Sequence, residues 1–182
     1  MARVLVAIPT GGEVRATTVN WLLGFDRCGH DVNIMVSELR PIEANRNHIR
    51  KAFLAGDYDY LIQMDSDILP PVNLLEIVDF DKDIISAGIK TVKGDQVLPL
   101  ALREVSEGEY LPMDYQGLFQ CSAVGGGCTC IRRNVLEHLD YRHMSETVKA
   151  EDFDFCKRAK DAGFEVWYHE GMKAVHFTTV GI

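Results

Sequence analysis

The stretch Tyr58-Asp-Tyr-Leu-Ile-Gln-Met-Asp-Ser-Asp67 decides the fold that this sequence predicts. It runs from an apolar segment, 60–64, directly into two aspartates that one residue separates. Carboxylates that follow a buried strand stand where an α/β sheet binds its ligands. Two such carboxylates can reach one hard divalent cation, which in turn bridges phosphate oxygens. An Asp-x-Asp triplet also opens turns, and two prolines follow at 70–71, so the triplet alone leaves both interpretations open.

Strands and helices alternate before this stretch. The expected elements are a strand over 3–8, a helix over 13–27, a strand over 31–36, a helix over 43–54 and the strand over 60–64. Apolar residues recur at helical spacing in the two helices, and Gly29 and Gly56 provide their stops. This order is typical of a parallel sheet whose ligands bind beyond the carboxyl ends of the strands.

Shorter elements follow in the second half of the chain. The expected elements are a short helix over 73–80, a strand over 83–88, hairpins or a loop over 90–120, a glycine-interrupted strand over 121–132, helices over 134–139 and 151–162, and strands over 165–168 and 173–176. No repeat, linker or low-complexity segment divides the sequence. We therefore expect a single domain.

The composition suits one globular domain with a substantial core. The chain has 182 residues, of which 47% are hydrophobic and 25% are charged, and its net charge is −8. The acidic balance argues against a long nucleic acid or an anionic membrane as partner. No apolar stretch is long enough for a membrane span and no export signal is recognisable, so the sequence predicts a cytoplasmic protein with five reduced cysteines.

Acidic residues open the predicted helix over 151–162. Glu151, Asp152 and Asp154 lie in its first turn and basic residues in its last turns, which complements the helix dipole. A carboxylate that faces a cleft from this position can alternatively act as a general base. His176 ends the last predicted strand, where it is either a surface histidine or a nitrogen ligand beside the aspartates of 65–67.

The glycines of Gly125-Gly-Gly127 interrupt an apolar segment. They allow the backbone to bend or to approach a ligand closely. No Lys-Ser or Lys-Thr pair follows them, so they do not form a phosphate-binding loop. The sequence also lacks Gly-x-Gly-x-x-Gly after its first strand, which argues against a dinucleotide-dependent oxidoreductase.

Taken in order, these segments resemble the GT-A glycosyltransferases, particularly the family-2-like members. The segments that carry the resemblance are Ile8-Pro-Thr10, Ala44-Asn-Arg-Asn47, 58–67, 123–133, 151–158, 162–167 and Val175-His176. The resemblance implies an α/β, Rossmann-like fold with a mixed, mainly parallel sheet flanked by helices. It also implies a nucleotide-binding half over 1–89 and an acceptor and catalytic half over 90–182.

The resemblance assigns roles to single residues. The residues it implies as ligands of Mn²⁺ or Mg²⁺ are Asp65, Asp67 and His176. The residues it implies at the nucleotide are Pro9, Thr10, Ser37, Glu38, Arg46, Asp65 and Ser66. Asp152 resembles the catalytic base of inverting members, with Glu151 as the second choice. The acid on the second strand that usually reads the base is not clearly identifiable, so the nucleotide stays open.

The implied activity is metal-dependent transfer of a sugar from a nucleotide-sugar donor to an acceptor hydroxyl, with retaining chemistry left open. One alternative is a sugar-phosphate nucleotidyltransferase. Such an enzyme usually has a glycine-rich basic loop after its first strand, of which Gly11-Gly12 and Arg15 form only a part. Another is a non-catalytic subunit that binds nucleotide sugars. Acceptor recognition is expected from 90–120 or from a partner chain, and homo-oligomer formation stays open.

Overall fold

Strands and helices alternate through the first half of the chain, as the sequence predicts. The structure is a computed structural model that describes residues 1–93, 95–143 and 150–177. Its first elements are β1 (Arg3–Thr10), α1 (Ala16–Gly24), β2 (Asp31–Glu38), α2 (Ile42–Ala55) and β3 (Tyr60–Met64). Strands β2 and β3 both pair with β1 in parallel. The predicted parallel strand–helix pattern is therefore confirmed.

After β3 come two long strands, β5 and β12, several short strands and three further helical segments. These elements are β4 (Ile68–Leu69), the 3-10 helix η1 (Leu74–Phe80), β5 (Ile84–Lys93), β6 (Gln96–Pro99), β7 (Ala101–Ser106), β8 (Glu109–Pro112), β9 (Leu118–Gln120), β10 (Ala123–Val124), β11 (Cys128–Arg132), α3 (Arg133–His138), α4 (Glu151–Asp161) and β12 (Val166–His176). The predicted hairpins of 90–120 are present as β5–β6 and β7–β8.

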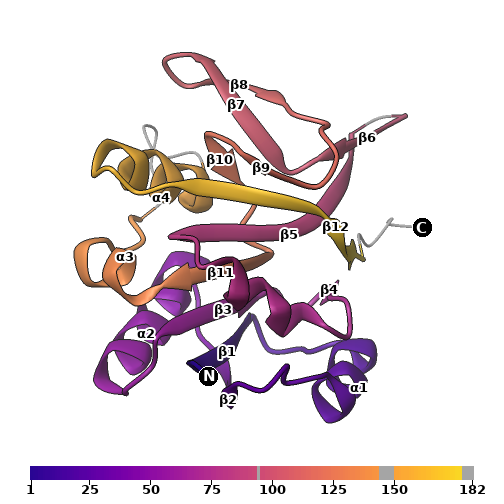
Figure 1. Cartoon of the computed structure of the whole chain (residues 1–182), viewed down its shortest axis with the longest axis vertical. Helices are drawn as coiled ribbons and strands as arrows, with labels where there is room; N and C mark the ends of the chain where they lie inside the picture. The colour runs from indigo at the N-terminus through magenta and orange to yellow at the C-terminus, as the bar shows by residue number, and fades with distance from the viewer. Residues whose placement is uncertain (94, 144–149, 178–182) are drawn as a thin grey trace.

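The central sheet has the strand order β2-β1-β3-β11-β5-β12-β4, with β6 beside β5 and β9 beside β12 (Figure 1). Strand β11 runs antiparallel to both of its neighbours, β3 and β5, whereas β12 runs parallel to β5. Strands β2, β1, β3, β5 and β12 therefore share one direction, which makes the sheet mixed and mostly parallel. Strands β10, β7 and β8 form a second, small sheet.

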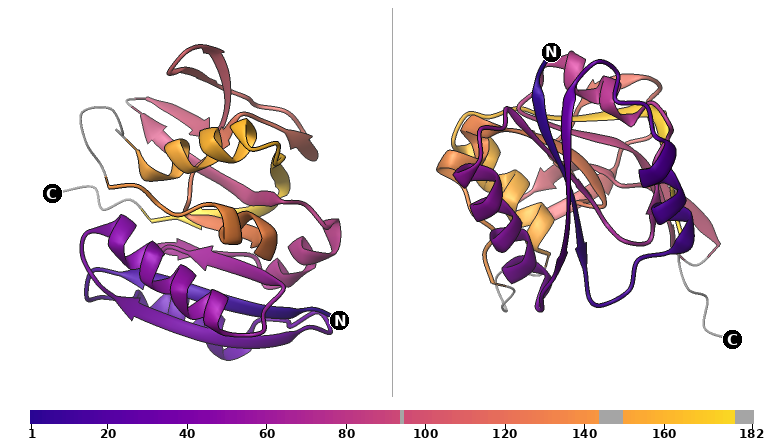
Figure 2. Two further views of the ribbon diagram at one scale, coloured as in Figure 1. Left: turned by 90° about the vertical axis from the view of Figure 1, so that its left-hand side faces the viewer. Right: turned by 90° about the horizontal axis from the view of Figure 1, so that it is seen from below.

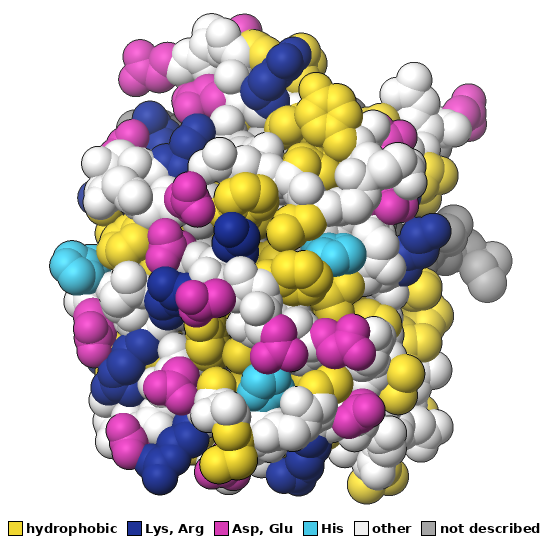
Figure 3. Space-filling view, viewed as in Figure 1, with side chains coloured by type: hydrophobic (Ala, Val, Ile, Leu, Met, Phe, Trp, Pro, Cys, Tyr) yellow, Lys and Arg dark blue, Asp and Glu magenta, His cyan; other side chains and the backbone are white. Residues whose placement is uncertain are grey.

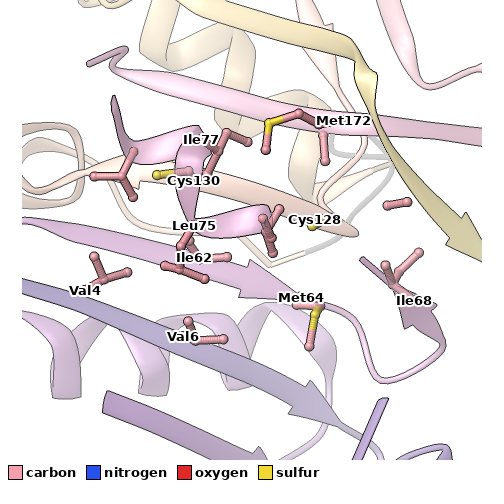
Figure 4. Close-up of a cluster of buried hydrophobic side chains, with 14 of the residues drawn as sticks. Val4, Val6, Ile62, Met64, Ile68, Leu75, Ile77, Cys128, Cys130 and Met172 are labelled. Atoms are coloured by element: carbon pink, nitrogen blue, oxygen red, sulfur yellow. The ribbon is translucent and has the colours of Figure 1, made fainter. Parts of the chain in front are cut away.

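Helices cover both faces of the central sheet. Figure 2 shows α2, α3 and α4 on one face and α1 on the opposite face. Alternate residues of β1 point to the two sides: Val4 and Val6 pack in the core beneath α1 and η1, and Leu5 packs beneath α2. Figure 4 shows the first of these cores, where Met64 and Ile68 flank the turn that carries the aspartates. The turn thus rests on a rigid apolar floor.

Two features of the surface bear on partners. Acidic and basic side chains are interspersed over the face seen in Figure 3, without a continuous basic area among the described residues there. No described helix is long and apolar enough to cross a membrane.

The five cysteines carry free thiols, and four of them are buried.

The first helix is shorter than the predicted segment 13–27. The structure limits α1 to Ala16–Gly24 because Arg15 and Phe25, at its two ends, have extended backbone conformations. Apolar spacing continues past both ends, but local spacing does not encode where the backbone leaves the helix.

The glycines divide the predicted strand 121–132 into two strands in different sheets. Strand β10 pairs with β7 in the small sheet, and β11 pairs with β3 and β5 in the central sheet. The three glycines between them let the chain pass from one sheet to the other. A Cβ atom at Gly125 would lie 2.8 Å from the side chain of Leu100, so the crossing is tightly packed.

The two predicted strands 165–168 and 173–176 form one strand, β12. Its register on β5 shifts between His169 and Lys173, where the extra residues form a bulge. Gly88 of β5 accommodates this bulge, because a Cβ atom there would lie 2.6 Å from the carbonyl oxygen of Glu170. The sequence shows the glycines but not the pairing that joins the two segments.

Candidate functional site

A cleft of about 640 Å³ opens at the carboxyl ends of β1, β2 and β3. Its lining residues are Pro9, Thr10, Gly11, Leu39, Arg40, Pro41, Ile42, Asp65, Ser66 and Asp67. Ligands of parallel α/β sheets bind at this edge. The cleft brings together five of the residues that the sequence predicts at the nucleotide or the metal, namely Pro9, Thr10, Asp65, Ser66 and Asp67.

The ends of β1 and β2 are held together by one buried amide. Pro9 pairs with Ser37, and Thr10 pairs with Glu38. The amide nitrogen of Asn45, on α2, donates to the carbonyl oxygens of Thr10 and Ser37 at 3.2 and 2.8 Å. Ser37 is itself buried and does not line the cleft, whereas Glu38 is exposed beside it.

The Asp65–Asp67 turn is fixed by its backbone. The N–H of Asp65 donates to the carbonyl oxygen of Gly127 at 2.9 Å. The carbonyl oxygen of Ser66 accepts from the N–H of Arg15 at 3.3 Å and from the hydroxyl of Thr18 at 3.2 Å. These bonds attach the turn both to the glycine segment and to the start of α1. The aspartates are therefore presented on a pre-organised loop.

His176 and Asp67 lie side by side at the mouth of the turn. Strand β12 pairs with β4 so that His176 stands opposite Ile68, and the Nε2 atom of His176 lies 3.3 Å from Oδ2 of Asp67. Both side chains are partly exposed, at 26% and 44%. The Nδ1 atom of His176 is buried without a hydrogen-bond partner.

These two side chains fit a hard divalent cation. Two ligand atoms about 3 Å apart are within reach of one ion that binds oxygen and nitrogen near 2.1 Å. The third predicted ligand, Asp65, faces Arg46 instead, with Oδ1 3.1 Å from Nη2. Among the described residues, no three His, Cys, Asp or Glu side chains converge on one point. A cation held by Asp67 and His176 thus has positions left for phosphate oxygens.

Arg46 lies beneath the cleft and not in its lining. Only 2% of it is exposed. Its guanidinium donates to Asp65 at 3.1 Å, to Gln63 at 3.1 Å and to the carbonyl oxygen of Gly126 at 3.1 Å. Its Nε atom lies 3.3 Å from Oε1 of Glu151. One buried cation therefore joins the first aspartate of the turn to the acidic start of α4.

The charge of Arg46 is secured by its neighbours. Burial lowers the pKa of the guanidinium, but Asp65 and Glu151 are among the groups that raise it well above its ordinary value overall. In turn, burial raises the pKa of Asp65 and Arg46 opposes that rise. The three groups form a compensated buried network.

Asp152 is held on the other side of the glycine segment. Its Oδ2 atom accepts from the N–H of Gly126 at 2.9 Å, and its Oδ1 atom accepts from the N–H of Phe153 at 2.8 Å. Burial, followed by the negative charge of Glu151, raises its pKa to about 6. A carboxylate that titrates near neutral pH is suited to take and return protons.

Gly126 belongs to the site through its backbone, a role that the sequence motifs do not predict. Its carbonyl accepts from Arg46 while its N–H donates to Asp152, so one peptide unit connects the two. The sequence does signal a close approach at the glycines, but not which group approaches.

We expect Gly126→Ala to destabilise the protein. A Cβ atom at this position would lie 2.8 Å from Nη2 of Arg46, so the guanidinium must shift out of its hydrogen bonds. Overpacking of this kind costs about 1–3 kcal/mol, which urea denaturation measures as a lower midpoint. Gly24→Ala is the matched control, because nothing lies within 4 Å of a Cβ atom there. Equal midpoints for the two variants would contradict the expectation.

Comparisons with known proteins support the fold. No protein-family model matches the sequence, and no curated protein matches it either. The crystal structure of A197 from STIV superposes with a TM-score of 0.69 at 21% identity, covering 97% of this chain and 86% of that one. GalNAc-T7, solved with UDP, GalNAc and Mn²⁺, superposes with a TM-score of 0.68 at 13% identity, covering 97% of this chain and 44% of GalNAc-T7. The chain therefore has an α/β fold similar to that of a GT-A glycosyltransferase.

Proposed function

We propose that this protein is a metal-dependent glycosyltransferase, which moves a sugar from a nucleoside-diphosphate donor to an acceptor hydroxyl. The observation that carries the proposal is the network around Arg46. It connects the Asp65–Asp67 turn, at the floor of a nucleotide-sized cleft, to the Glu151–Asp152 pair. A transferase needs these two functions within one site: a place for the leaving diphosphate and a base for the attacking hydroxyl.

Asp67 and His176 hold the cation in this proposal, and Asp65 supports the turn through Arg46. Their oxygen and nitrogen atoms suit Mn²⁺ or Mg²⁺. A cation held by these residues would supply positive charge against the departing nucleoside diphosphate. GalNAc-T7, whose structure contains UDP and Mn²⁺, is consistent with this assignment.

Asp152 acts as the base. It accepts the proton from the acceptor hydroxyl as the oxygen bonds to the anomeric carbon and the bond from that carbon to the diphosphate breaks. Glu151 is the less suitable group, because its carboxylate is already engaged by the guanidinium of Arg46, with Oε1 3.3 Å from Nε. Residues 1–89 then form the nucleotide-binding half, and residues 90–182 supply the base and the acceptor side.

Calorimetric titration with nucleoside diphosphates, with and without MnCl₂, tests the donor site. We expect one nucleotide to bind the wild-type protein in a metal-dependent manner. Asp67→Asn weakens this binding at least about tenfold, because it removes the charge of a direct ligand. The control is Asp31→Asn, at the opposite end of β2 from the cleft. Binding that ignores both the metal and the Asp67→Asn substitution would refute the proposed donor site.

A further inference from the structure

The cleft has two kinds of lining. The Asp65–Asp67 turn contributes carboxylates. Leu39, Pro41 and Ile42 contribute an apolar wall, with Arg40 among them in the sequence. If the diphosphate of a donor lies at the aspartates, as the proposed function requires, then its base lies against this wall. The inference below rests on that function and concerns which base is bound.

Arg40 supplies a positive group in the lining of the cleft. Its side chain is exposed, and its Nη2 atom donates to the carbonyl oxygen of Gly11 at 2.7 Å. A Cβ atom at Gly11 would lie 2.9 Å from Nη2 and 3.1 Å from Nε, so the guanidinium rests against bare backbone. This contact uses one of the five N–H donors of the guanidinium and leaves the others for a ligand.

Glu38 supplies a negative group next to it. It ends β2, where it pairs with Thr10, and its side chain is exposed. Its Oε1 atom lies 3.4 Å from the position of a Cβ atom at Gly12, so the carboxylate stands over the second glycine as Arg40 stands over the first. Among the described residues, no ion pair includes either Glu38 or Arg40. Both charges are left for a third group.

We infer that the cleft binds a guanine nucleotide. Guanine presents two neighbouring acceptors, O6 and N7, which match the fork of a guanidinium. It also presents two neighbouring donors, N1–H and the 2-amino group, which match the two oxygens of a carboxylate. Arg40 offers its fork over Gly11 in the cleft, and Glu38 offers its carboxylate over the next residue, Gly12, beside the cleft. Guanine satisfies both of them with paired hydrogen bonds.

The other bases satisfy this pair less well. Uracil and thymine have a single ring N–H between two carbonyls. They can therefore donate only one hydrogen bond to the carboxylate, and they have no pair of adjacent acceptors for the guanidinium. Cytosine offers N3 and O2 to a guanidinium but only its amino group to a carboxylate. Adenine has no carbonyl and no ring N–H in its base-pairing face. Only guanine combines two adjacent acceptors with two adjacent donors.

Titration of the wild-type protein with GDP, UDP, CDP, dTDP and ADP in MnCl₂ tests the inference. A bidentate contact typically discriminates between bases by about tenfold or more. We therefore expect GDP to bind at least about tenfold more tightly than any of the other four. Arg40→Gln and Glu38→Gln each reduce the ratio of GDP affinity to UDP affinity toward one. Arg103→Gln, an exposed arginine on β7 outside the cleft, leaves that ratio unchanged.

The possible results distinguish failure of the guanine inference from failure of the proposed function. Metal-dependent binding that favours a pyrimidine nucleotide or ADP overturns the guanine inference and leaves the donor site in place. A preference for GDP that neither substitution reduces also overturns the inference, because Arg40 and Glu38 then do not read the base. If none of the five nucleotides binds in MnCl₂, the proposed function fails and the inference fails with it. Both side chains are exposed, so thermal melting is expected to show folded variants.

Discussion

Asp152→Asn is expected to lower kcat about 10³-fold, within the range for loss of a general base, and to change nucleotide affinity less than twofold. Asparagine has the same shape, and its side-chain oxygen can still accept from the N–H of Gly126 or Phe153. It cannot take a proton from the acceptor hydroxyl. The measurement is initial transfer rate under saturating donor, with Asp161→Asn, at the exposed end of α4, as the control.

The wild-type rate is expected to rise with pH through about 6, where Asp152 loses its proton. The ionised form is the active one in this mechanism, so the rate falls below pH 6 and is level above it. The residual rate of the Asp152→Asn variant is expected not to rise with pH around 6. A wild-type profile without an inflection between pH 5 and 7 would exclude Asp152 as the base.

The same substitution is expected to be more favourable to stability at pH 8 than at pH 4. The pKa of Asp152 rises from 3.8 to about 6 on folding, so the ionised form is disfavoured in the folded state. The stability that this group contributes is complete below about pH 4 and is lost as the pH rises through 6. Asparagine gives up one accepting oxygen at either pH, but only at pH 8 does it also remove a charge, which recovers about 1–3 kcal/mol. Urea denaturation at pH 8 and at pH 4 measures this, and an equal change at both values would contradict the assignment.

Arg46→Met is expected to lower the free energy of unfolding at pH 7 by about 3–5 kcal/mol, since it removes one partner from a buried ion pair. Asp65 and Glu151 both lose their cation, and Gln63 and Gly126 lose a donor. Methionine has a similar length and no charge, so the loss of packing is small.

The pH dependence separates the charge effect from packing. In Arg46→Met, Asp65 loses the group that opposes the rise of its pKa on burial, so the neutral form of Asp65 is favoured and the loss of stability is smaller at pH 4 than at pH 7. Chemical denaturation at both pH values measures the difference. Arg103→Met, on the exposed face of β7, is the control and is expected to change stability by less than 0.5 kcal/mol in either direction, about the limit for surface positions. A loss of stability in Arg46→Met that is the same at both pH values would indicate packing alone.

Much of the fold follows from local patterns in the sequence. The period of the amphipathic helix α2 indicates a helix, and the short apolar run 60–64 is typical of a fully buried strand by its length. The sequence-based predictions are wrong where pairing with a strand that is distant in the sequence determines the structure. Gly125 to Gly127 divide one apolar segment because its first residues pair with β7, and 165–176 forms one strand because β5 continues beside it. Such pairings are set by register between remote segments.

Part of the site follows from the sequence and part does not. Asp67 and His176 meet because β4, which begins directly after Asp67, pairs with the end of β12, where His176 stands opposite Ile68. The position of Arg46 does not follow from the sequence, because a helix face becomes a cleft wall or a buried layer according to what packs on it. Here the start of α4 and the Gly126 peptide cover the guanidinium. The charge network is a property of three elements together.

The shared guanidinium also restricts how this chain can diverge during evolution. Asp65 and Glu151 belong to elements 86 positions apart in the sequence, yet a single cation compensates both. Loss of that cation in one step leaves two uncompensated acids, whereas loss of one acid leaves Arg46 paired with the other. The acids can therefore be replaced one at a time, but the arginine cannot be replaced before them. Position 46 is expected to be retained in every lineage that keeps an acid at 65 or 151.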